Sequence, residues 1–220
     1  MLSKERFLLI LVIFSTICCG CVAESVNTAK ITTNLINAQK EINDISYTEK
    51  LIIPIENGST STKSDFSIRK PNLYKKVDWI NSSIHLITVS NETSSWIYDP
   101  TTNTILMKNS TSLNSVANLP AYKNFILNMS DNCTMNYQET EFLGGVQIYK
   151  LEVISNKQNE TCNRHILWID PEIWMPLKIQ SYNGDNPLMT LEYSNYSINT
   201  GLETNEFEFK VPKTASVVGS

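Results

Sequence analysis

The run Tyr149-Lys150-Leu151-Glu152-Val153 (YKLEV) alternates strictly between apolar and polar side chains. This alternation is typical of a β-strand that buries one face, because successive side chains of a strand point to opposite sides of the sheet. The same period recurs in the C-terminal part of the chain at Leu177–Ile179, Met189–Tyr193 and Phe207–Val211. Turns that contain glycine and asparagine separate these runs, so we expect consecutive antiparallel strands with one apolar face.

Strands are also expected in the first half of the chain. A polar Gly/Ser/Thr segment at 57–64 interrupts the pattern there, and we expect it to be a loop. Short β-rich runs bounded by turn residues predict strands over Tyr47–Ile55, Phe66–Arg69, Ile84–Val89, Trp96–Tyr98 and Thr104–Lys108.

Two segments have helical periodicity. Apolar residues recur at helical spacing between 27 and 45, where Asn27 or Thr28 can cap the first turn. A second window covers 112–130 and contains Pro120, which is expected to break it. These two helices are the only segments available to cover the apolar face of the sheet.

The expected fold is therefore α+β and mainly β. A strongly twisted antiparallel sheet can curl into an unclosed barrel around the helices, which then act as a plug or lid. Such a barrel leaves an apolar concavity where the helices do not fill it. The alternative is a fully packed interior without a cavity, which the sequence pattern alone slightly favours.

The N-terminus carries an export signal. A short basic start precedes an apolar run from Phe7 to Ile17. The run has about eleven residues, roughly half of what a membrane-spanning helix needs. Gly20-Cys21 resembles the lipobox of exported lipoproteins, in which the cysteine after the cut carries the lipid. A plain secretory signal cut near Ala23 is the alternative.

These signals divide the chain into three parts. We predict a signal peptide with lipobox at 1–20, a lipid-anchored linker at 21–27 with the lipid on Cys21, and one domain at 28–220. The protein would then be held on the outer face of the cell membrane. Its two remaining cysteines, Cys133 and Cys162, are expected to form a disulfide, because the chain is exported.

The polar composition also suits an exported chain. The 18 basic and 22 acidic residues are mixed along the sequence and give a net charge of −4, which excludes a basic surface for nucleic acid. Eight Asn-x-Ser/Thr sequons mark candidate glycosylation sites at Asn57, Asn81, Asn91, Asn109, Asn128, Asn132, Asn159 and Asn195.

The sequence offers little for catalysis. Its two histidines, His85 and His165, lie in strand-like contexts, and no His/Cys spacing suits a metal. No nucleophile elbow, phosphate loop or dinucleotide fingerprint is present. We expect neither an enzyme nor a bound cofactor or metal.

Four stretches occur in order along the chain and carry a family resemblance. Individually they contain common features, such as Asp-Pro turns and a Phe-x-Phe run. In this order they resemble the outer-membrane lipoprotein carrier and sorting family, the LolA-like proteins, over most of the chain after the signal. The stretches are SDFSIRKPNLYKKVDW (Ser64–Trp79), WIYDPTTNTILMK (Trp96–Lys108), LWIDPEIWMPLKIQSYN (Leu167–Asn183) and NEFEFKVPKTASVV (Asn205–Val218).

The resemblance implies an unclosed antiparallel barrel with a helical lid around a hydrophobic cavity for acyl chains. It also implies an arginine before the third strand that holds the lid, for which Arg69 is the candidate here. From the apolar faces of the expected elements, we predict that the cavity is lined by Ile31, Leu35, Ile42, Leu151, Val153, Leu191, Tyr193, Phe207 and Phe209.

The predicted function is that of a membrane-anchored cell-surface lipoprotein. It would bind the acyl chains of a lipid or a lipidated protein in this cavity, as a carrier or receptor. The alternative is an envelope sensor or protein-interaction module with the same fold, a filled core and another envelope protein as its partner.

Overall fold

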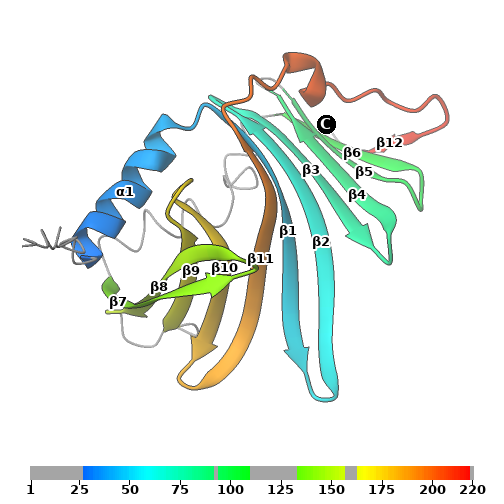
Figure 1. The fold of residues 1–220 in the computed structure, drawn as a ribbon. Coiled ribbons are helices and arrows are strands. Elements are labelled where there is room, and N and C mark those ends of the chain that lie inside the picture. Colours follow the sequence, from blue (N-terminus) through cyan, green and yellow to red (C-terminus); the bar gives the residue numbers. More distant parts are fainter. Residues whose placement is uncertain (1–26, 92–93, 110–132, 157–162, 219–220) are drawn as a thin grey trace, which may run out of the picture.

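The computed structural model describes residues 27–91, 94–109, 133–156 and 163–218. Figure 1 shows a single curved, unclosed sheet with a helix on its inner side. This confirms the predicted fold class. The elements are α1 (Thr28–Glu41), β1 (Asp44–Ile55), β2 (Gly58–Arg69), β3 (Leu73–Ile80), β4 (Ser83–Ser90), β5 (Ser94–Asp99), β6 (Thr104–Asn109), β7 (Cys133–Leu143), β8 (Val146–Ser155), β9 (Arg164–Asp170), β10 (Met175–Asn183), β11 (Asn186–Ile198), the short 3-10 helix η2 (Thr204–Phe207) and β12 (Ser216–Val218).

The sheet has twelve strands in the order β12-β6-β5-β4-β3-β2-β1-β11-β10-β9-β8-β7. Neighbouring strands are antiparallel, except that β12 pairs with β6 in parallel. Strands adjacent in sequence pair with each other in both halves, as expected for antiparallel strands joined by short turns. The pairing of β1 with β11 joins the two halves, so the two edges of the sheet are β7 and β12.

Helix α1 begins where the sequence predicts. The Asn27 side chain accepts a hydrogen bond from the backbone N–H of Ala29 at 2.8 Å, which satisfies one of the free donors of the first turn. The buried stripe of the helix contains Ile31 and Leu35, one turn apart.

The helix ends earlier than predicted. We expected it to reach residue 45, but it stops at Glu41 and Ile45 already lies in β1. The Asn199 side chain explains the stop: it donates to the Glu41 carbonyl at 3.1 Å and accepts from the Asn43 N–H at 2.7 Å. These bonds hold the chain in the turn that leads into β1.

The two faces of the sheet are distinguished by strand register. Tyr47 lies opposite Phe66, while the next pair, Thr48 and Asp65, points to the other side. We call the side that α1 covers the concave face and the other side the convex face. The core on the concave face consists of Ile31, Leu35, Ile45, Tyr47, Phe66, Ile68, Leu151, Val153, Leu167, Ile169, Met175, Ile179, Leu191 and Tyr193.

A second, smaller core lies on the convex face of β3 to β6. The chain after β11 crosses this face before β12 (Figure 1). Phe207 in this segment is buried, as are Val89 and Ile105 on the strands. The ring of Phe209 lies 6.3 Å from the ring of Trp96, measured between centroids.

Two strand predictions need correction. The predicted strand over Phe207–Val211 is wrong, because Phe207 ends η2 and the next strand is β12. The alternation there arises from an irregular segment that presses Phe207 and Phe209 onto the sheet. The predicted loop at 57–64 is also wrong, because β2 begins at Gly58. Side chains 58–63 are exposed on both faces, which hides the period of two. The predicted helix at 112–130 and the N-terminal segment 1–26 lie outside the described residues.

Candidate functional site

The apolar part of the concave face lies under α1. Ile31 and Leu35 from the helix pack with buried side chains from both halves of the sheet, including Leu151 from β8 and Tyr47 from β1. Ile42, Leu51 and Tyr149 are partly buried against the same core. This arrangement gathers aliphatic and aromatic side chains on one side of a sheet that does not close.

Polar contacts hold α1 at its two ends. Near the start, the Thr28 hydroxyl accepts a hydrogen bond from the Tyr137 N–H of β7 at 3.0 Å. At the end, the Lys70 ammonium donates to the Lys40 carbonyl at 2.9 Å. Between these ends the buried side chains Ile31 and Leu35 are apolar, so they constrain the position of the helix through packing.

A row of polar side chains crosses the concave face beside the apolar core. We call it the polar band: Glu49, Ser64, Lys76, Asp78 and Tyr193. The register places Tyr193 opposite Glu49, Glu49 opposite Ser64, and Ser64 opposite Asp78. Ser64 Oγ donates to Asp78 Oδ1 at 2.6 Å, and Lys76 Nζ lies 2.8 Å from the same oxygen.

The polar band carries an excess of negative charge. It holds two carboxylates and one ammonium, and the ammonium of Lys76 is paired with Asp78. Burial raises the pKa of the Glu49 carboxyl, against the opposing effects of the Tyr193 hydroxyl and the Lys76 charge. Burial also raises the pKa of the neighbouring Tyr74 phenol, and the charges of Asp78 and Glu49 add to this effect. The site therefore favours a cation or a proton.

Beyond the polar band, the concave face becomes apolar again. Along β1 the inward-facing residues after Glu49 are Leu51, Ile53 and Ile55, because side chains alternate between faces. Ile53 is 41% exposed and Ile55 is 55% exposed, and Ile80 at the same end of β3 is 43% exposed. We call Ile53, Ile55 and Ile80 the apolar rim. The polar band thus lies between a buried apolar core and an exposed apolar rim.

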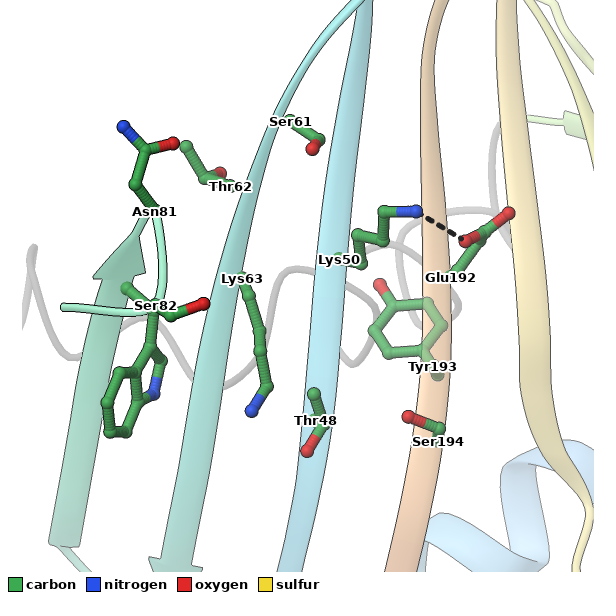
Figure 2. Close-up of a pocket in the computed structure, with 11 residues that line it drawn as sticks. Thr48, Lys50, Ser61, Thr62, Lys63, Asn81, Ser82, Glu192, Tyr193 and Ser194 are labelled. Atoms are coloured by element: carbon green, nitrogen blue, oxygen red, sulfur yellow. Dashed lines mark ion pairs between the residues drawn. The ribbon is translucent and has the colours of Figure 1, made fainter. Parts of the chain in front are cut away.

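The convex face has a groove of a different kind. An open pocket of about 770 Å³ lies across β2, β1 and β11, and Figure 2 shows the residues that line it. Lys50 forms an ion pair with Glu192 at 3.7 Å on one side of it, and the Lys63 ammonium lies 5.3 Å from the centre of the Trp79 ring on the other. Hydroxyl and amide groups make up most of the remaining wall, so the groove is poorly suited to an acyl chain. The residues that line it are Thr48, Lys50, Ser61, Thr62, Lys63, Trp79, Asn81, Ser82, Glu192, Tyr193 and Ser194.

The two histidines are placed apart. His85 is exposed on β4, whereas His165 on β9 lies with its Nδ1 atom 2.9 Å from Ser181 Oγ. Within the described part of the chain, no three His, Cys, Asp or Glu side chains come together as metal ligands. None of the helices in that part is long and apolar enough to cross a bilayer.

Comparison with known proteins places this fold in a family. A family model described as an uncharacterized protein matches residues 82–209. An outer-membrane lipoprotein carrier protein of Francisella tularensis subsp. tularensis is 24% identical over 197 residues, which cover 88% of this chain and 90% of that protein. The chain belongs to the family that this model describes, and the similarity to the carrier protein makes it LolA-like.

A solved structure agrees on the fold. An uncharacterized conserved protein from Thermus thermophilus superposes with a TM-score of 0.56 at 14% identity, over 88% of this LolA-like chain and 100% of that one. A LolA superfamily protein from Nitrosomonas europaea matches over 84% of this chain and 99% of that chain, with a TM-score of 0.38 and 10% identity.

In this LolA-like protein, Arg69 does not contact α1. Its Nη1 atom donates to the Leu202 carbonyl at 2.8 Å and lies 3.3 Å from the Thr204 hydroxyl. Both partners belong to the segment that crosses the convex face. Arg69 therefore fastens that segment, while its neighbour Lys70 contacts the end of α1.

The predicted lining residues divide between the two faces. Phe207 and Phe209 lie on the convex face, under the C-terminal segment and away from the other seven. The structure brings together on the concave face Ile31, Leu35, Ile42, Leu151, Val153, Leu191 and Tyr193.

The predicted modification sites are only partly described. Cys133 opens β7, while Cys21 and Cys162 lie outside the described residues. Asn109 is in β6, and the sequons at Asn128, Asn132 and Asn159 also lie outside the described residues. The side chains of the remaining sequon asparagines are exposed at Asn57, Asn81 and Asn195 and half-buried at Asn91.

The polar band was not predicted from the sequence, although a signal exists. In the alternation Tyr47, Glu49, Leu51, the charged residue occupies the apolar phase of the strand. Lys76 and Asp78 likewise share a phase on β3. A charge in the buried phase of a strand marks a polar site on the covered face.

Proposed function

We propose that this LolA-like protein binds the acyl chains of lipids or lipidated proteins on the concave face of its sheet. The observation that carries the proposal is the convergence of buried aliphatic side chains from α1 and both halves of an unclosed sheet on one face. Its relative in Francisella tularensis is named an outer-membrane lipoprotein carrier protein, which supports the same class of ligand.

The mechanism is burial of apolar surface. Each methylene that moves from water to the concave face contributes about 0.8 kcal/mol, so a long chain binds without a specific polar contact. Helix α1 covers part of this face and must shift to admit a chain. The shift keeps the helix tethered if the Lys70 contact at its C-terminal end persists while the Thr28 contact opens.

Export and anchoring are part of the proposal. A lipid on Cys21 would hold the domain at the outer face of the membrane, where lipids and lipoproteins are available. A disulfide between Cys133 and Cys162 would link β7 to the residue that precedes Asn163 in the sequence. Its support is that Cys133 lies opposite Ser155, whose N–H donates to the carbonyl of Asn163, the residue after Cys162.

An interaction module is the second candidate function. The edge strand β12 is only three residues long and exposes Val217 and Val218. An edge strand presents unpaired backbone groups that another chain can join. A partner from the envelope would then add its strand beside β12, without a ligand on the concave face.

Competition with a fluorescent acyl probe tests the proposed function. The form used begins at Ser25, because every described helix and strand lies between Thr28 and Val218. Saturated fatty acids of increasing length compete for the probe. Affinity should rise by up to about 1.6 kcal/mol for every two methylenes added. Absence of probe binding, or competition that is independent of chain length, would overturn the proposal.

A further inference from the structure

We propose that the polar band is a head-group site that selects amphiphiles with a cationic, ammonium-bearing head. The inference rests on the proposed function, because the acyl chain of such an amphiphile must bind on the same concave face. An apolar surface alone selects for an acyl chain, and the polar band would add a preference for the charge of the head group.

The position of the polar band suits the polar end of an amphiphile. On β1, Glu49 is flanked on the concave face by Tyr47 of the buried core and by Leu51, which leads to the apolar rim. An acyl chain that lies along either apolar surface therefore brings its head to Glu49. A fully apolar ligand would leave the Glu49 carboxylate desolvated and unpaired, which is costly.

Charge pairing within the polar band leaves one carboxylate for a ligand. The Asp78 carboxylate is already bound by the Lys76 ammonium and the Ser64 hydroxyl. Glu49 lies opposite Tyr193, and no cationic side chain in the described part of the chain lies within ion-pair distance of it. An ammonium head beside Glu49 completes the pairing, whereas an anionic head adds a like charge.

The described side chains that face Glu49 come from β3 and β11. Tyr74, Lys76 and Asp78 face it from β3, and Tyr193 faces it from β11. The buried residues of α1, Ile31, Leu35 and Gln39, carry no charge.

Three ligands of equal chain length test the inference by displacement of the acyl probe: dodecylammonium, dodecanol and dodecanoate, each below its micellar concentration at neutral pH. The ammonium compound should bind at least about tenfold tighter than dodecanoate, which corresponds to about 1.4 kcal/mol. Glu49→Gln should remove most of this preference for the ammonium compound over dodecanoate.

Glu192→Gln is the matched control. Glu192 adjoins Tyr193 in sequence but lies on the convex face, paired with Lys50. This variant should keep the preference of the wild-type protein. Equal binding of all three ligands by the wild-type protein, or a preference that survives in Glu49→Gln, overturns the inference while acyl binding stands. Failure of every dodecyl ligand to displace the probe counts against the proposed function itself.

A measurement on the wild-type protein covers the case in which Glu49→Gln does not fold. Dodecylammonium and dodecanol keep their charge states between about pH 5 and about pH 8, whereas a carboxyl with a raised pKa gains its proton as the pH falls. The ratio of their affinities should therefore decline toward acidic pH. A constant ratio contradicts the inference.

Discussion

Replacing Phe207 tests whether the C-terminal segment is part of the folded core on the convex face. Its side chain is 1% exposed, while Phe142 in β7 is 74% exposed, so the chain contains a buried and an exposed phenylalanine for comparison. Phe209 next to it contacts the rings of Trp96 and Tyr98. Loss of the Phe207 ring should therefore loosen the whole segment.

The magnitude follows from burial. Truncating a fully buried phenylalanine to alanine typically costs about 3 to 5 kcal/mol, which combines the lost transfer free energy with the cavity that remains. Phe207→Ala should lower the free energy of unfolding by an amount in this range. Phe142→Ala should change it by less than about 0.5 kcal/mol, as is usual for exposed sites.

Urea denaturation followed by tryptophan fluorescence measures both variants. The midpoint should shift for Phe207→Ala at an unchanged slope, since the slope reports the surface exposed on unfolding. Acyl-probe affinity should stay at the wild-type value, because Phe207 lies on the face away from α1. A stability loss below about 1 kcal/mol, or a loss equal to that of Phe142→Ala, would refute the argument.

Three further predictions concern other parts of the fold. Asn27→Ala removes the cap of α1 and should cost about 1 kcal/mol in urea denaturation, whereas Asn27→Ser should keep most of the stability. Burial raises the pKa of the Glu49 carboxyl above 4.5, so the folded state binds the carboxyl proton more tightly than the unfolded chain does. The contribution of Glu49 to stability is therefore present at low pH and is lost as the pH rises through the folded-state pKa. Glu49→Gln should then melt above the wild-type protein at neutral pH, and the gap should close on acidification; a gap that is constant with pH would contradict the assignment. Intact-mass measurement with and without reductant should show the loss of two hydrogens if Cys133 and Cys162 are joined, and a mass unaffected by reduction would exclude the bond.

The periodicity of the sequence predicted most of the sheet, because buried strands keep a strict alternation. Leu151 and Val153 are buried on the same face, as the alternation in YKLEV requires. The prediction failed where alternation had another cause or was missing. Phe207 and Phe209 alternate in a segment without strand pairing, and the polar start of β2 is a strand without an apolar face.

The sequence predicted the residues of the site less well than it predicted the fold. Apolar side chains on the two faces of a sheet look alike in sequence, so Phe207 and Leu191 could not be separated without the topology. The resemblance alone suggested Arg69 as a lid residue, whereas its hydrogen bond to Leu202 depends on the path of the chain after β11. The polar band depends on register across β11, β1, β2 and β3, which local patterns do not determine.

Native mass spectrometry tests the central claim most directly. The form beginning at Ser25 is purified from the natural host without detergent, and any bound lipid is extracted and identified. Acyl binding on the concave face should give co-purifying lipid near one molecule per protein, which an added acyl probe displaces. A protein that is empty and also fails to bind such probes would contradict acyl binding and favour the interaction module.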